Sequence, residues 1–287
     1  MTHVLSPSSE PSADCPAEYP IDYMVTELDA LGYVNQCWWV SIVLIMSYVW
    51  AVQGAMPIAG LILVVILTLP RWIISVHELL HIYAPEQLNR IICLLGSSPV
   101  PLSPLTLGYG EIRAIHLAHH RAPTTDADPD AYHIRGSSGW VFLNAMTTHE
   151  QDTMRWISTH GLSLSLAIEL VIKFGILGTL AWFGGATFWW FWLTLRLVYG
   201  VSDFIFFRCV HCQKGSYGNF ALSLPPALLR IGEWIYGKTV VHATLNHDLH
   251  HQYPGLAARN LTLARERGKG EGRRGKGERR KARGVPN

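Results

Sequence analysis

The sequence predicts an all-α, multi-pass membrane protein in which four transmembrane helices form two hairpins and a histidine-rich helical cap lies on the cytosolic side. Three observations support this prediction. Of the 287 residues, 49% are hydrophobic and only 15% are charged, whereas a soluble domain is about 25% charged. Four apolar runs each approach the roughly 20 residues that cross a bilayer as a helix. Eight of the 14 histidines fall into three short clusters at or beyond the ends of these runs.

The four apolar runs come in two pairs, and each pair is joined by a connection too short to hold a domain. The runs cover residues 37–55, 58–76, 161–183 and 186–207. Pro57 and the Gly184-Gly185 dipeptide mark the two connections, as expected for turns. Pro70, inside the second run, is compatible with a spanning helix if neighbouring groups satisfy the carbonyl that it frees. Each pair therefore predicts a helical hairpin.

A further apolar stretch, residues 91–107, does not predict a straight spanning helix. It is interrupted by Gly96, Pro99, Pro101 and Pro104. Proline has no backbone N–H and clashes with the preceding helical turn, so three prolines in six residues break a helix. We expect an interfacial or re-entrant segment here.

The chain divides by composition into three parts. Residues 1–36 form a polar, acidic leader without the features of a cleavable signal peptide, and its second half, around residues 23–31, suggests a short interfacial helix. Residues 37–258 form the membrane domain. Residues 259–287 form a basic tail with eleven Lys and Arg against three Glu. Its low-complexity stretch 268–284 cannot bury a core, and it is either a contact for anionic lipid or an incidental extension.

The distribution of basic residues predicts the orientation. The two connections inside the hairpins carry no Lys or Arg, whereas the middle segment 77–160 and the C-terminal region carry nearly all of them. Cytoplasmic loops are enriched in Lys and Arg. We therefore expect an integral membrane protein with both termini and all three histidine clusters on the cytoplasmic side.

Four charged residues lie within the third and fourth apolar runs. Glu169 and Lys173 are four residues apart, and Arg196 and Asp203 are seven apart, so each pair shares a helix face. Ionisable residues inside a membrane are candidates for function. Pairing between helices is an equally valid alternative.

The three histidine clusters have the spacing of metal ligands. In a helix, residues i, i+3 and i+4 point to one side, so an H-x-x-H-H sequence presents three imidazoles on one face. The clusters are His77 and His81; His116, His119 and His120; and His247, His250 and His251. Eight histidines exceed the needs of one tetrahedral metal and suffice for two metals in a nitrogen-rich cage.

The order of these clusters, with a hairpin between the second and third, resembles the membrane fatty acid desaturase and hydroxylase superfamily. The resemblance runs from about residue 38 to residue 263. Residues 112–115, Arg121 and residues 128–130 resemble the surroundings of the family's second histidine box, and residues 250–255 resemble its third box. Glu78 is a departure, because the family more often has Asp there.

The resemblance implies a non-haem di-iron enzyme that activates O₂ to remove hydrogen from an unactivated C–H bond of a long-chain lipid. It implies that the eight clustered histidines are the iron ligands and the catalytic residues. Family members usually recruit a further ligand before the third box, for which the candidates are His211, His242 and Asn246. Metal-bound histidines normally donate their second N–H to a carboxylate or carbonyl. The nearby carboxylates are Asp126, Asp128, Asp130 and Asp248.

The expected activity is desaturation of a fatty acyl chain, with hydroxylation or ketolation of a carotenoid or another lipid as the alternative within the same superfamily. The sequence contains no dinucleotide-binding, haem-attachment or iron–sulfur motif. Electrons are therefore expected from an external donor such as a ferredoxin or a cytochrome, and no nucleic-acid partner is expected.

Two other interpretations of the histidines stay open. The sequence His77-Glu78-Leu79-Leu80-His81 has the H-E-x-x-H pattern of zinc proteases, in which Glu78 would be the general base. This interpretation leaves both H-x-x-H-H clusters unexplained. The second is a metal transporter or sensor, although transport sites usually lie near the bilayer midplane and these clusters do not.

Overall fold

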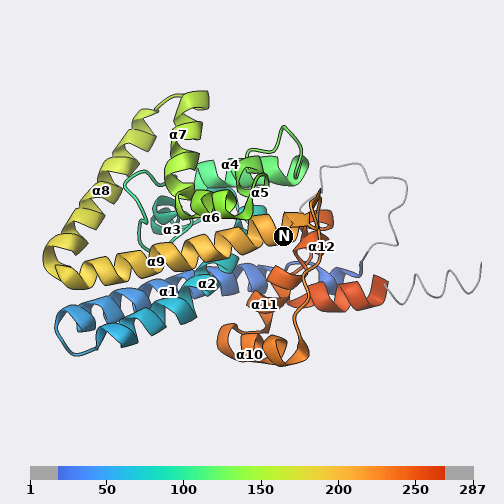
Figure 1. Cartoon of the computed structure of the whole chain (residues 1–287), viewed down its shortest axis with the longest axis horizontal. Coiled ribbons are helices and arrows are strands. Elements are labelled where there is room, and N and C mark those ends of the chain that lie inside the picture. The colour runs from blue at the N-terminus through green and yellow to red at the C-terminus, as the bar shows by residue number, and fades with distance from the viewer. Residues whose placement is uncertain (1–18, 269–287) are drawn as a thin grey trace, which may run out of the picture.

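A computed structural model describes residues 19–268, and these residues are mostly helical (Figure 1). The α-helices are α1 (Glu27–Val52), α2 (Ile58–Ile82), α3 (Arg90–Leu95), α4 (Tyr109–Arg121), α5 (Ala131–Ile134), α6 (Ser138–Met146), α7 (Thr148–His160), α8 (Leu164–Gly184), α9 (Ala186–Phe204), α10 (Pro226–Tyr236), α11 (Lys238–Leu245) and α12 (His247–Gln252). The other elements are 3-10 turns at Ile21–Tyr23, Pro85–Gln87 and Ala258–Asn260, a π-helical continuation of α9 at Ile205–Cys209, and the antiparallel strands β1 (Cys212–Gln213) and β2 (Ser216–Tyr217). Residues 261–268, after the last 3-10 turn, are also helical.

Four helices in this part of the chain are long and apolar enough to cross a membrane, which confirms the all-α class and the four apolar helices. They are α1, α2, α8, and α9 together with its π-helical continuation. Residues 91–107 form no such helix, as expected. After α3 the chain runs as an irregular loop to α4.

Helix α1 begins earlier than the sequence pattern predicts. The backbone N–H of Asp29 donates to Thr26 Oγ1 at 3.2 Å, and the backbone N–H of Thr26 donates to Asp29 Oδ2 at 2.9 Å. This reciprocal capping box fixes a helix start. The expected separate helix around residues 23–31 is therefore wrong, because residues from Glu27 onward are the first turns of α1.

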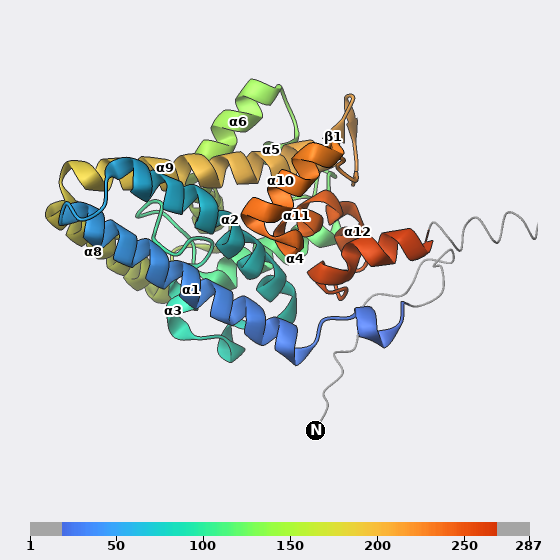
Figure 2. The same cartoon turned by 90° about the horizontal axis from the view of Figure 1, so that it is seen from below.

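Helices α1, α2 and α9 form the apolar centre of the fold. They pack side by side in Figures 1 and 2, and their facing side chains are fully buried. These include Leu44 of α1, Leu61 and Val65 of α2, and Phe191 and Leu195 of α9. Most of α8 is exposed; Figure 1 shows it diverging from α9 with the loop between α3 and α4 lying between them.

The buried loop between α3 and α4 is held by polar side chains of the long helices. Lys173 Nζ of α8 donates to the carbonyl of Thr106 at 2.6 Å. Trp192 Nε1 and Arg196 Nη1 of α9 each donate to the carbonyl of Leu102 at 2.9 Å. Irregular backbone is tolerated among apolar helices only where such partners satisfy it, so these side chains allow the loop to be buried.

The charged residues of α8 and α9 all find partners. Glu169 and Lys173 pair within α8 at 3.4 Å, as their spacing predicts. Arg196 and Asp203 do not pair with each other. Arg196 forms an ion pair with Glu150 of α7 at 2.7 Å, and Asp203 accepts a hydrogen bond from Thr148 at 2.7 Å.

The segments that flank the long helices are tied together at one end of the molecule. Residues before α1 bond to the chain after α12, through Val25 N–H to the Gly255 carbonyl and Ala257 N–H to the Tyr23 carbonyl, both at 2.9 Å. The predicted tail begins inside this packing, since Leu261 and Ala264 are fully buried. Residues 1–18 of the predicted leader and 269–287 of the predicted tail lie outside the described residues.

Candidate metal centre

Each histidine cluster lies on a helix at the same end of the molecule. His77 and His81 occupy the last turns of α2, the second cluster lies near the end of α4, and the third lies along α12. Figures 1 and 2 show α4, α11 and α12 gathered around the end of α2. The i, i+3, i+4 spacing turns each set of rings inward, toward the other two.

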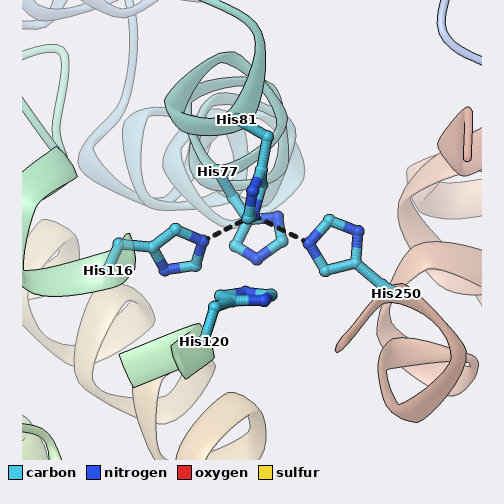
Figure 3. A group of neighbouring side chains, drawn as sticks. All are labelled: His77, His81, His116, His120 and His250. Atoms are coloured by element: carbon cyan, nitrogen blue, oxygen red, sulfur yellow. Dashed lines mark hydrogen bonds between the residues drawn. The ribbon is translucent and has the colours of Figure 1, made fainter. Parts of the chain in front are cut away.

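Five of these histidines form a first group. Each has a ring nitrogen within 4.8 Å of a ring nitrogen of every other member, and Figure 3 shows the rings converging. His81 Nε2 lies 2.8 Å from His116 Nε2 and 3.0 Å from His250 Nε2. The members are His77, His81, His116, His120 and His250.

The second group contains His119, His211 and His251, whose ring nitrogens also lie within 4.8 Å of one another. His119 Nε2 is 3.3 Å from His211 Nε2. His247 adjoins this group, because its Nε2 is 3.2 Å from that of His251. His211, one of the candidates for a further ligand, therefore lies beside the histidine clusters.

The two groups are immediate neighbours. His119 and His120 are consecutive on α4 and contribute to different groups. The rings of His120 and His251 stack with their centroids 4.0 Å apart. All eight clustered histidines and His211 thus belong to one continuous, two-part arrangement of imidazoles.

These rings fit a pair of nitrogen-ligated metal ions. Burial lowers the pKa of His116, His120, His247 and His250 well below 6.5, and that of His211 to about 4. A neutral imidazole keeps one lone pair for a metal. Among the described residues, the buried Nε2 atom of His77 and both ring nitrogens of His120 have no hydrogen-bond partner. Bound metal ions would satisfy such nitrogens.

Hydrogen bonds on the outer side of the rings orient them. His119 Nδ1 donates to Asp128 Oδ1 at 2.9 Å. His211 Nδ1 donates to the Gly218 carbonyl at 3.2 Å, and His77 Nδ1 lies 3.2 Å from Glu78 Oε1. When Nδ1 carries the proton, Nε2 is left as the metal ligand.

Some predicted site residues are not brought to the two groups. His242 has both ring nitrogens engaged elsewhere, with Nε2 at 2.6 Å from Glu233 and Nδ1 at 2.5 Å from Thr262. Asn246 accepts from Arg265 at 2.5 Å. The carboxylates of Asp126 and Asp248 form ion pairs with Arg135 and Arg265.

The sequence did not reveal a second buried polar group beside the histidines. His133 of α5 lies close to Asp130 and to Asp152 of α7, and these three side chains have ring nitrogens or carboxylate oxygens within 4.8 Å of one another. Tyr132 donates to Asp152 at 2.5 Å. The sequence had identified Asp130 as a candidate partner of a metal-bound histidine, but His133 and Asp152 belong to no motif, so only their burial could have identified them.

One cavity borders both the histidines and this polar group. Four histidines line it, namely His77, His116, His119 and His247. The rest of its wall is partly apolar, from α2, α4 and the end of α9, and partly polar, from α7, α9 and Asp130.

A scan against models of protein families, a search of curated proteins and a search of solved structures each found no match to this chain.

Proposed function

We propose that this protein is an O₂-dependent, membrane-embedded di-iron oxidoreductase that acts on a long-chain lipid, with desaturation of a fatty acyl chain as its reaction. In this proposal α1 and α2 span the bilayer as one hairpin, and α8 and α9 span it as the other. The histidine groups and both termini face the cytoplasm.

The observation that carries the proposal is the pair of adjacent, buried, all-imidazole groups at one end of four apolar helices. Imidazole suits iron, copper, zinc and nickel. The order of the three clusters along the sequence, and its resemblance to the desaturase and hydroxylase superfamily, favour iron. The neighbouring positions of the groups favour two ions acting on one substrate.

Each part of the chain has a role in this proposal. His77, His81, His116, His120 and His250 would hold one ion, and His119, His211, His247 and His251 the other. Iron in such a site would supply O₂ activation for removal of hydrogen from a C–H bond. Asp128 keeps the proton of His119 on Nδ1.

The cavity supports a lipid substrate, because its apolar wall is built from side chains of the proposed spans. Ile73 and Val76 of α2 line it together with Phe206 and Phe207 at the end of α9. An acyl chain can thus approach from the bilayer. A carotenoid or another lipid, hydroxylated or ketolated, is the alternative substrate, because the histidine arrangement is common to these reactions. The electrons would come from an external ferredoxin or cytochrome.

The zinc-protease alternative fits the geometry less well. In a zinc protease the Nε2 atoms of His77 and His81 would face the metal. The glutamate base would have to reach the water bound at the open coordination position of that metal. Glu78 Oε1 instead lies beside Nδ1 of His77, and it is 3.9 Å from Nδ1 of His250. The side chain of Glu78 is therefore placed to orient ligands. Glu78→Gln should abolish a protease but leave an oxidoreductase with measurable activity.

Metal content tests the proposal most directly. The full chain is purified in detergent, reconstituted with ferrous iron under argon and analysed by elemental mass spectrometry, followed by analysis of lipid products. Two irons per chain and an oxidised lipid product are expected. A single tightly held zinc, with no iron uptake after chelation and reconstitution, would refute the di-iron centre and favour the protease.

Membrane orientation can be tested separately. Single cysteines at Gln53, between α1 and α2, and at Thr125, beside the histidines, are introduced after replacement of the native cysteines. In intact cells, a membrane-impermeant maleimide should label position 53 and not position 125. The reverse pattern would overturn the proposed sidedness while leaving the metal centre untouched.

A further inference from the structure

The cavity beside the histidines has a polar wall that removal of hydrogen from a plain hydrocarbon does not require. Its members come from the loop after α3, the segment before α5, the start of α7 and the end of α9. They are Ser97, Asp130, Thr148, Asp152, Tyr199 and Asp203. A cavity that accepted only an acyl chain would be expected to have apolar walls throughout.

The carboxylates in this wall keep acceptor positions available. Asp203 Oδ2 accepts from Thr148 Oγ1 at 2.7 Å, and Asp152 Oδ1 accepts from Tyr132 at 2.5 Å. A carboxylate has roughly four acceptor positions, and each of these hydrogen bonds uses one. The wall is therefore able to receive hydrogen bonds from a bound molecule.

His133 is buried against the same carboxylates. It is 1% exposed, and neither ring nitrogen has a hydrogen-bond partner among the described residues. Its Nδ1 is 3.3 Å from Asp203 Oδ2 without the alignment of a hydrogen bond. Its ring also lies near Asp130 and Asp152. A buried polar atom without a hydrogen bond is destabilising.

The acidic groups in the wall restrict what it can bind. Three aspartate carboxyls already crowd this wall, so a further carboxylate, such as the head group of a free fatty acid, is disfavoured there. Arg155 lies 4.0 Å over the ring of Tyr132, the partner of Asp152, and offsets part of the negative charge. A neutral group that both donates and accepts hydrogen bonds fits best.

We propose that the polar wall binds a hydroxyl group of the substrate, so that the protein acts on a hydroxylated lipid whose apolar chain lies along the opposite wall beside the histidines. The identity of this ligand as the substrate rests on the proposed function; the existence of the site does not. The hydroxyl hydrogen is donated to Asp203. Its oxygen accepts from a neighbouring hydroxyl of the same wall, such as that of Tyr199.

Binding of a matched pair of probes tests the site on the full chain in detergent. The probes are 1-octadecanol and 1-methoxyoctadecane, which differ by replacement of the hydroxyl hydrogen with methyl, and each competes with radiolabelled 1-octadecanol. The alcohol should compete at least about tenfold better, because the ether has no hydrogen to donate and leaves a buried acceptor unsatisfied. Asp203→Asn should remove most of this preference. Asp22→Asn, an exposed aspartate far from the cavity in sequence, should retain it.

Three results would overturn the proposal: equal competition by the two probes in the wild type, an unchanged preference in folded Asp203→Asn, or tighter binding of octadecylamine than of the alcohol. If Asp203→Asn fails to fold, Thr148→Val and Tyr199→Phe provide the same comparison. Binding is measured with and without iron. A preference for the alcohol in a chain that takes up no iron would uphold this site and refute the oxidoreductase. Iron uptake without the preference would refute this site and uphold the di-iron centre.

Discussion

The imidazole of His119 donates its Nδ1 proton to Asp128, whose Oδ1 atom lies 2.9 Å away, and both side chains are buried. Asp128 also accepts the backbone N–H groups of Thr124 at 2.7 Å and of Asp130 at 2.9 Å. One carboxylate thus fixes both the loop after α4 and the orientation of a candidate ligand. These hydrogen bonds favour its ionised form and hold the pKa of Asp128 below its usual value, against the opposing effect of burial.

Asp128→Asn should weaken metal binding without releasing the protein from the membrane. The asparagine amide keeps one acceptor, but it cannot stabilise the ring as a carboxylate does. Loss of such a partner typically lowers metal affinity 10–100-fold. Iron bound per chain is measured against free ferrous iron. Asp126→Asn is the matched control, since that carboxylate is exposed and paired with Arg135; equal iron affinity in both variants would contradict the role given to Asp128.

His211 and His242 provide a second matched comparison. His211 lies among the second group of imidazoles, whereas both ring nitrogens of His242 are bonded to Glu233 and Thr262. If the proposed di-iron centre is correct, His211→Ala should lose about one of two irons, and His242→Ala should keep both while losing some stability. Elemental analysis of the two purified variants decides between them. Full iron content in His211→Ala would exclude His211 from the centre.

These two histidines also show what could be predicted from the sequence. The H-x-x-H-H spacing placed three rings on one helix face, so the clusters were recognisable without a structure. His211 and His242 stand alone, and nothing local separates them. The distinction depends on which long-range partners each ring meets, and Glu233 and Thr262 become partners of His242 only when α10, α11 and the chain after α12 pack together.

The charged residues of the long helices show the same difference between contacts within one helix, which the sequence predicts, and contacts between helices, which it does not. Glu169 and Lys173 pair because their spacing is set by one helix. Arg196 and Asp203 share a face of α9 but contact Glu150 and Thr148, since the first turn of α7 lies beside that face. Local periodicity was therefore sufficient to predict contacts within one helix. Contacts between elements, including the polar wall of the cavity, required the fold.

The metal-free protein should lose stability as the pH falls below 6.5. Burial lowers the pKa of His133 and His149 to about 3, so below 6.5 the unfolded chain binds protons that the folded chain does not. Each such histidine removes up to roughly 1.4 kcal/mol per pH unit. Burial raises the pKa of Asp152 to about 6, which acts oppositely: its contribution is full below 3.8 and is lost as the pH rises through 6.

Between pH 6.5 and 4 the buried histidines outweigh Asp152 and Asp130, whose pKa burial also raises. The metal-free centre adds five further histidines with lowered pKa, namely His116, His120, His211, His247 and His250. The free energy of unfolding should therefore decline. Chelated protein in detergent micelles is unfolded with denaturant at several pH values. His149→Asn should reduce the slope of this dependence, because one of the buried histidines is removed. A stability that rises on acidification over this range would show that the histidines are protonated in the folded state.

Lys173→Met should destabilise the fold although it removes a buried charge. The carbonyl of Thr106 would lose its 2.6 Å donor, and Glu169 would lose its partner. An unsatisfied buried acceptor costs roughly 1–3 kcal/mol. Denaturant unfolding in micelles measures the loss, with Phe174→Leu on the exposed face of α8 as the control. A stability unchanged from the control would mean that the loop carries its own hydrogen bonds.

Helix α10 should lie in the membrane interface. None of its residues is buried, and Leu228, Ile231 and Trp234 are exposed, Trp234 to 86%. Arg71 of α2 donates to the carbonyl of Ile235 at 2.8 Å, which fixes the end of α10 beside a proposed span. An apolar helix face at that depth is stabilised by lipid.

A nitroxide at Trp234→Cys tests this placement after replacement of the native cysteines. In vesicles it should be relaxed strongly by O₂, which concentrates in lipid, and weakly by a water-soluble nickel chelate. A nitroxide at Thr125→Cys, an exposed position in the loop after α4, should show the opposite pattern. If position 234 were as accessible to the chelate as position 125, α10 would face water, and its apolar face would have to be covered by protein instead of lipid.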